Sequence, residues 1–254
     1  MLKQTAVLAM TVAVMSNALA AEETNSLGLS LSGTAALTTD YRFRGLSQTQ
    51  NDPAVQATFT VSHDSGVYLG VFGSNVHFGD DSPHLELSPY LGYSTELNFS
   101  DTLKPVLDIS YTRFNYPGWS DWAWNEFSVK LSFADVIINH DSLLTSINYG
   151  DDYAGFAGDE WNFSLGYVVP IADTGFGLVT GLGYTSIDQT GALADASADD
   201  YIDWKVGISY DLKSLAGLTA ELAAVGTNID TDGLARVTKR GVDTGAVFTL
   251  SKSF

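Results

Sequence analysis

The sequence contains no cysteine, so neither disulfides nor thiolate metal sites can hold its fold together. It is also poor in basic residues, with 12 Lys and Arg against 30 Asp and Glu and a formal net charge of −18. Such an excess of negative charge disfavours nucleic acid as a partner. Long apolar runs are missing too, because no segment approaches the roughly 18 consecutive apolar residues that a transmembrane helix requires.

The chain begins with MLKQTAVLAMTVAVMSNALA. Lys3 supplies a positive charge, a short apolar run follows from about Ala6 to Met15, and Ala18 and Ala20 precede the sequence AEET. This three-part pattern is typical of a secretory signal peptide, and its apolar run is too short to span a bilayer. We therefore expect a signal peptide over residues 1–20, Sec-type export, and a single mature domain over 21–254.

Residues 27–44 alternate strictly between two kinds of side chain. The odd positions from Leu27 to Phe43 are mainly apolar or aromatic, and the even positions from Gly28 to Arg44 are small, polar or charged. Period-two alternation is the signature of a strand with one apolar face. Helical periodicity is nowhere sustained, which indicates an all-β fold.

The same alternation recurs along the chain and predicts a transmembrane antiparallel β-barrel of about twelve strands. The links after even-numbered strands are mostly short, and those after odd-numbered strands are longer and more acidic on average. This alternation, with an even strand count and a signal peptide, is typical of outer-membrane barrels, whereas a β-sandwich would not require it. The predicted strands cover residues 27–44, 53–62, 66–76, 84–97, 103–115, 122–133, 142–149, 160–169, 175–187, 200–211, 217–227 and 242–254.

Aromatic residues on the apolar faces fall into two rows, as the two lipid–water interfaces of a bilayer would select. The row near the long loops comprises Tyr41, Phe43, Tyr111, Tyr149, Trp161, Tyr184 and Trp204. The row near the short turns comprises Phe59, Tyr93, Phe133, Tyr167, Phe176, Tyr210 and Phe254. Phe254 ends the last strand with Phe248 and Leu250 on the same face, which resembles the signal read by the barrel assembly machinery.

The opposite parity places charged side chains inside the barrel, because charge on the lipid face would cost about 2 to 4 kcal/mol per residue near the midplane. A lumen with both signs of charge can orient and pass small polar solutes. Alternatively, these charges pair with one another and fill the interior. The predicted lumen residues are Arg42, Arg44, Glu86, Glu96, Asp108, Glu126, Lys130, Asp203, Lys205 and Glu221.

The stretch DYRFRGLSQTQNDPAVQ, residues 40–56, resembles the signature of the TorF family of porins, a largely uncharacterised family. The resemblance implies an outer-membrane barrel and a pore, and it brings no catalytic residues. Part of this stretch is expected to be turn geometry, since Asn51 and Asp52 precede Pro53.

Nothing else in the sequence points to an enzyme, a cofactor or a metal site. His63, His77, His84 and His140 lack an informative partner spacing, and the acidic runs lack the register of a calcium loop. We therefore expect a passive outer-membrane channel for small hydrophilic solutes that meets membrane lipid and lipopolysaccharide. The alternative is a non-conducting barrel that acts as a structural or surface-interaction protein through its acidic loops, and a barrel enzyme ranks last. The sequence does not decide between a monomer and a homo-oligomer.

Overall fold

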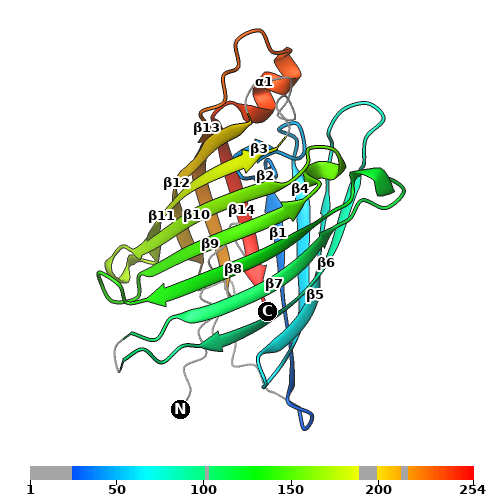
Figure 1. Cartoon of the computed structure of the whole chain (residues 1–254). Helices are drawn as coiled ribbons and strands as arrows, with labels where there is room; N and C mark the ends of the chain where they lie inside the picture. The colour runs from blue at the N-terminus through cyan, green and yellow to red at the C-terminus, as the bar shows by residue number, and fades with distance from the viewer. Residues whose placement is uncertain (1–24, 101–102, 189–198, 213–216) are drawn as a thin grey trace.

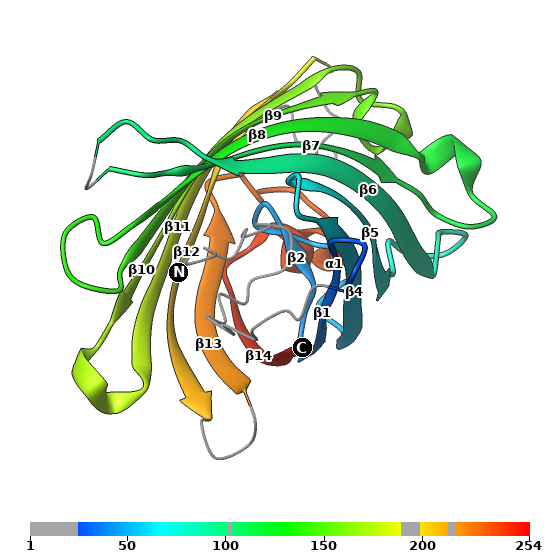
Figure 2. The ribbon, with the colours of Figure 1, turned by 90° about the horizontal axis from the view of Figure 1, so that it is seen from below.

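The computed structural model describes residues 25–100, 103–188, 199–212 and 217–254, and within them twelve strands close into one antiparallel barrel (Figures 1 and 2). This confirms the predicted fold class. The proposed signal peptide over 1–20 lies outside the described residues. The barrel strands are β1 (Leu29–Thr38), β4 (Ala54–His63), β5 (Val67–Asn75), β6 (Leu85–Glu96), β7 (Val106–Phe114), β8 (Trp124–Ala134), β9 (Ser142–Asp151), β10 (Glu160–Pro170), β11 (Phe176–Ile187), β12 (Asp200–Leu212), β13 (Leu218–Thr227) and β14 (Gly245–Ser253).

Each strand pairs with its neighbours in sequence, and the first and last strands close the ring. β1 pairs with β4 from Leu29 opposite His63 to Thr38 opposite Ala54, and with β14 from Thr34 opposite Ser253 to Thr38 opposite Thr249. The links divide into a short-turn end and a long-loop end. Among the described residues, the long-loop end carries 39–53, 76–84, 115–123, 152–159 and 228–244.

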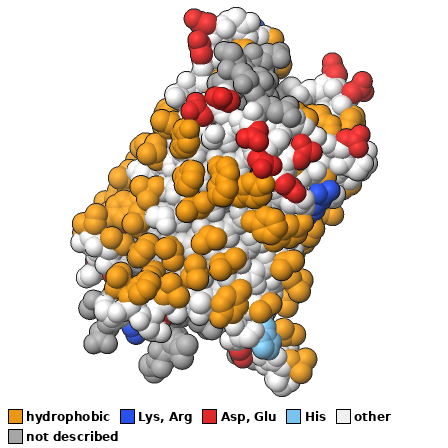
Figure 3. Space-filling model, viewed as in Figure 1, with side chains coloured by type: hydrophobic (Ala, Val, Ile, Leu, Met, Phe, Trp, Pro, Cys, Tyr) orange, Lys and Arg blue, Asp and Glu red, His pale blue; other side chains and the backbone are white. Residues whose placement is uncertain are grey.

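The outer surface of the barrel is apolar, as a wall that faces lipid must be (Figure 3). Leu31 and Leu37 of β1 are 63% and 56% exposed, whereas Thr38 is buried against the interior. Aromatic side chains of both predicted rows lie on this surface, including Trp161 and Tyr184 in one row and Phe59, Phe176 and Phe254 in the other. No helix in the described part of the chain is long and apolar enough to cross a membrane.

One predicted strand is wrong at its end, and the error changes the site. β1 stops at Thr38 rather than at residue 44, and residues 39–53 turn into the barrel, where β2 (Arg42–Phe43) pairs with β3 (Leu46–Ser47). Tyr41 and Phe43 therefore do not belong to the outer aromatic row, because they are only 3% and 7% exposed inside the barrel.

The reversal between β2 and β3 depends on left-handed backbone at two residues, Arg44 (φ 49°) and Gly45 (φ 79°). A Cβ added at Gly45 would lie 2.6 Å from Cγ2 of Thr227 and 2.9 Å from Cβ of Asp203. Glycine is therefore required there both for its backbone freedom and for its close approach to the barrel wall. The sequence pair RG marks this turn.

Short helical segments cap the long-loop end. They are η1 (Ser120–Trp122), η2 (Tyr153–Gly155) and the helix α1 (Arg236–Val242), while η3 (Ala172–Thr174) lies in a turn at the other end. α1 contacts β3, so it sits over the inward loop (Figure 1). β8 begins at Trp124, whose side chain is 3% exposed inside the barrel. This explains why Trp124 has the opposite parity from the lipid-facing Phe127.

Candidate functional site

The inward loop, residues 39–53, is held in shape by Asp40. The Asp40 carboxylate accepts hydrogen bonds from Ser47 Oγ at 2.6 Å, Thr49 Oγ1 at 3.1 Å and Asn51 Nδ2 at 3.0 Å. It also pairs with the guanidinium of Arg42. Four side chains spread along the loop thus bind one buried carboxylate, so the loop is held in its conformation by its own hydrogen bonds and ion pair.

Arg42 connects this unit to the loop that carries α1. Its Nη1 donates to the carbonyl oxygens of Gly45 at 2.9 Å, Gly241 at 3.0 Å and Asp243 at 3.2 Å. The side chain is 4% exposed. Carbonyl oxygens at the carboxyl end of a helix carry partial negative charge, so this end of α1 suits a cation.

Arg44 connects the loop to the barrel wall. It forms ion pairs with Glu126 of β8 at 2.5 Å and with Glu160 of β10. Burial alone would lower the pKa of Arg44, but the two carboxylates outweigh it and hold that pKa above its usual value. The guanidinium carbon also lies 4.6 Å from the centroid of the Phe43 ring.

The apolar side of the loop packs into an aromatic cluster in the barrel. Phe43 makes edge contacts with Phe114 and Trp124, at centroid distances of 5.5 and 6.4 Å. The Tyr41 ring packs on Phe72 at 5.8 Å, and its hydroxyl donates to Glu86 Oε2 at 3.1 Å. The loop therefore presents Arg44 to carboxylates of the wall, Arg42 to carbonyl oxygens near α1, and its aromatic rings to other aromatic rings.

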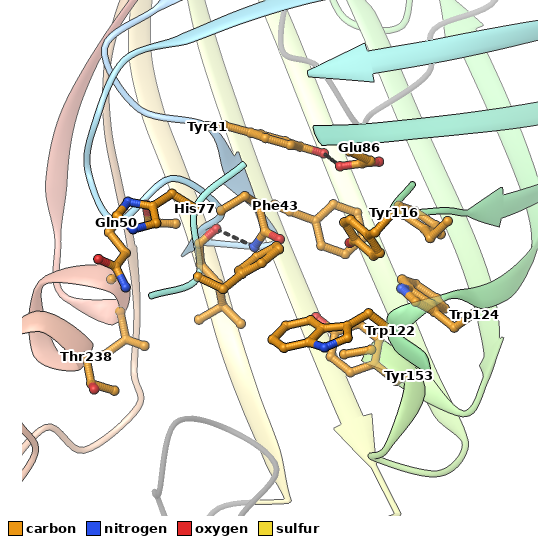
Figure 4. Close-up of a pocket in the computed structure, with 18 of the residues that line it drawn as sticks. Tyr41, Phe43, Gln50, His77, Glu86, Tyr116, Trp122, Trp124, Tyr153 and Thr238 are labelled. Atoms are coloured by element: carbon orange, nitrogen blue, oxygen red, sulfur yellow. Dashed lines mark hydrogen bonds between the residues drawn. The ribbon is translucent and has the colours of Figure 1, made fainter. Parts of the chain in front are cut away.

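The loop separates two cavities inside the barrel. The cavity toward the long loops, here called the vestibule, has a volume of about 350 Å³ and is lined by residues such as Tyr116, Trp122 and Thr238 (Figure 4). The cavity on the other side, here called the chamber, has a volume of about 170 Å³ and is lined largely by polar side chains of the strands. Of the residues that the structure describes, only Tyr41 and Phe43 line both cavities. These two rings form the partition between them.

The other predicted lumen residues lie at several depths. Asp108 accepts a hydrogen bond from Tyr68 at 2.6 Å, and its carboxylate lies 4.0 Å from the Lys130 ammonium. Lys205 pairs with Glu221 at 2.6 Å. Asp203 lines the chamber and is half-buried. Glu96, by contrast, is exposed at the short-turn end of β6 and lines neither cavity.

Several residues of this site were not predicted from the sequence. Glu160 is fully buried and pairs with Arg44, and it shares the inward parity of β10 opposite to Trp161 and Phe163, so the pattern contained the signal. The aromatic cluster, which includes Trp124 and Tyr153, could not be recognised because its rings come from separate loops and strands. Among the described residues, no group of three His, Asp or Glu side chains is placed to hold a metal ion.

Residues 21–254 match a family model described as a bacterial protein of unknown function (Gcw_chp). The chain belongs to this family. The family description carries no activity, and the resemblance to TorF stays a prediction. No curated protein matches the sequence.

Solved structures of porins share the fold of this family member. The NanC porin is 12% identical, with a TM-score of 0.51 over 89% of this chain and 99% of that one. The KdgM porin is 8% identical, with a TM-score of 0.50 over 88% and 99% of the two chains. OpdL of Pseudomonas aeruginosa is 14% identical, with a TM-score of 0.46 over 89% and 68%. At these identities, the likeness to NanC and KdgM shows the barrel fold alone.

Proposed function

We propose that this protein is a passive outer-membrane channel for small hydrophilic solutes, narrowed by the loop of residues 39–53. The observation that carries the proposal is the pair of cavities inside the barrel, which share only Tyr41 and Phe43 among the described residues. A solute would enter through the vestibule, pass these two rings and continue through the polar chamber.

The lipid-facing surface and the sequence support an outer-membrane location. The wall is apolar around the barrel, and the acidic side chains in view gather toward the long-loop end (Figure 3). A signal peptide would deliver the chain across the inner membrane, and Phe254 at the end of the chain would direct it to barrel assembly. The porin-type fold and the resemblance to TorF fit the same assignment.

The charges of the lumen support selectivity for small polar solutes. The chamber is lined by Lys130, Lys205, Asp203 and Glu221, so both signs of charge face the same space. Opposed charges across a narrow lumen act on the dipole of a passing solute and restrict ions of either sign.

The tight anchoring of the loop favours one alternative, a barrel that does not conduct at rest. Arg44 is paired with two wall carboxylates, and Arg42 is bound to three carbonyl oxygens within 3.2 Å. A loop held this firmly could close the barrel, which would then serve as a surface-interaction protein through its acidic loops.

Single-channel recording in a planar bilayer separates these functions. The native protein would be compared with a variant in which residues 41–50 are replaced by a short Gly–Ser linker. We expect steps of small conductance from the native barrel and larger steps from the variant. A silent native barrel with a conducting variant would support the closed alternative. If both insert in the folded state and neither conducts, the channel proposal is wrong.

A further inference from the structure

The walls of the vestibule are rich in aromatic rings (Figure 4). Phe114 and Trp124 stack at a centroid distance of 4.1 Å with an angle of 3° between the rings. Trp122 stacks on Phe78 at 5.4 Å and 24°. Tyr116 and Tyr153 also line the cavity. Flat aromatic surfaces from several elements therefore surround one space of about 350 Å³, which is within the usual size of a small-molecule site.

In the described part of the chain, one carboxylate lines the vestibule, that of Glu86. Glu86 is 1% exposed, and neutral hydroxyls donate to it, from Tyr41 at 3.1 Å and from Ser88 at 2.9 Å. Within the described residues, no Lys, Arg or His nitrogen lies within 4.0 Å of this carboxylate. When it is ionised, this carboxylate therefore has no counter-charge among the described residues.

This sets Glu86 apart from other buried acids of the lumen. Glu126 and Glu160 are paired with Arg44, and Glu221 is paired with Lys205. Buried charges in proteins are normally paired, because an isolated buried charge is strongly disfavoured. An unpaired carboxylate at the wall of an open cavity is consistent with a positive charge supplied by a ligand.

Aromatic faces favour the same kind of ligand. The face of an aromatic ring carries negative electrostatic potential, and several rings around one space bind ammonium groups with carbon substituents. An apolar ligand would leave Glu86 unpaired, and an anionic ligand would be repelled by it. A neutral sugar could stack on the rings but would bring no counter-charge.

The surroundings of the vestibule attract cations. The neighbouring loop carries Asp80 and Asp81, and acidic side chains cluster at this end of the molecule (Figure 3). Negative charge around an opening raises the local concentration of cations. α1 brings Arg236, Lys239 and Arg240 to the same end, but these side chains are exposed and do not line the vestibule.

We propose that the vestibule binds a small organic cation, a substituted ammonium ion, between its aromatic walls and Glu86. The inference rests on the proposed function in one respect: it names organic cations as a class of solute that the channel would admit. The binding step itself requires no conduction.

The test is binding of choline to the folded barrel in detergent, followed by tryptophan fluorescence and calorimetry. The comparison ligand is 3,3-dimethylbutan-1-ol, which has the shape of choline without its charge, and glucose and glucuronate are the neutral and anionic probes. We expect choline to bind and the other three to bind at least about tenfold more weakly. Equal binding of choline and its uncharged isostere, or preferential binding of glucose or glucuronate, would overturn the proposal.

Three variants test which residues of the vestibule bind choline. Glu86→Gln keeps the size and an acceptor oxygen for Tyr41 but removes the charge, and we expect it to weaken choline binding about tenfold. Trp122→Leu removes one ring from the exposed segment η1, and we expect a loss of about fivefold. Asp152→Asn is the matched control, because it removes one exposed acid at the same end that does not line the vestibule.

These measurements keep the two proposals separate. If Glu86→Gln binds choline as tightly as the native protein, or if Asp152→Asn loses as much affinity, the site assignment is wrong. If Glu86→Gln fails to fold on a heat-modifiability gel, Trp122→Leu and the isostere comparison still decide. Choline binding by a barrel that never conducts would reject the channel and retain the site, while conduction without choline binding would do the reverse.

Discussion

Replacing Arg44 by methionine tests how the inward loop is held in the barrel. Arg44 is 10% exposed and pairs with Glu126 and Glu160, whose side chains are 9% and 0% exposed. Methionine keeps much of the apolar stem but leaves two carboxylates buried without a counter-charge. Removing one partner of a buried ion pair typically costs about 3 to 5 kcal/mol.

We expect this cost to act on the loop rather than on the barrel. The backbone ladders on either side of Glu126 and Glu160 do not involve the loop, so the strands can remain paired while the loop leaves. Because about 1.4 kcal/mol corresponds to a tenfold change in an equilibrium, the released fraction of the loop should rise on the order of a hundredfold or more.

A single engineered cysteine measures this release, since the natural chain has none. Leu46→Cys places a half-buried thiol on β3, and its rate of labelling by a maleimide reports exposure of the loop. The rate should rise strongly when Arg44→Met is added, together with a larger single-channel conductance. The variant with Arg44→Met, Glu126→Gln and Glu160→Gln should recover most of the native rate, because no charge is left buried. Unchanged labelling in the single variant, or no recovery in the triple variant, would refute the reasoning.

Other parts of the structure give three further predictions. Tyr41→Ala with Phe43→Ala should join the two cavities and raise conductance, whereas Tyr41→Phe should keep the partition; equal currents from both would contradict a role for these rings. Burial would raise the pKa of Asp141, but a hydrogen bond from the Tyr167 hydroxyl at 2.5 Å and three backbone amides lower it to about 2. The ionised Asp141 carboxylate therefore stabilises the fold above the unfolded pKa of about 3.9, and this stabilisation is lost as the pH falls through 2. In urea unfolding, Asp141→Asn should be less stable than the native protein at neutral pH. Between pH 4 and 2, the variant should lose less further stability than the native protein does. Deleting Phe254 removes two backbone hydrogen bonds with Gly33, so it should slow folding into lipid vesicles, and an unchanged rate would count against a role for the chain end.

The alternating pattern was sufficient to predict the barrel, because lipid on one side and a polar interior on the other impose the same period on every strand. Glu86, Asp108 and Glu126 are buried on inward-facing positions, where parity placed them. The pattern was not sufficient for Glu96, since an inward position at the end of a strand can still lie in solvent beyond the lumen. Parity gives the side of the wall and carries no information on depth or on ion-pair partners.

The loop of residues 39–53 shows why the same pattern was wrong about Tyr41 and Phe43. A two-sided hairpin inside a barrel also alternates, with rings toward the aromatic cluster and arginines toward acids, so period two continues across a change of environment. Alternation tells which residues share a side, whereas the nature of that side depends on what surrounds it. The distinguishing signals were local: the turn at Arg44 and Gly45, and the polar residues Ser47 and Thr49, which bond to Asp40 and would have no partner on a strand facing lipid. Asp40 and Arg42 therefore stabilise the folded conformation of this loop inside the barrel, and Arg44 attaches the loop to the barrel wall.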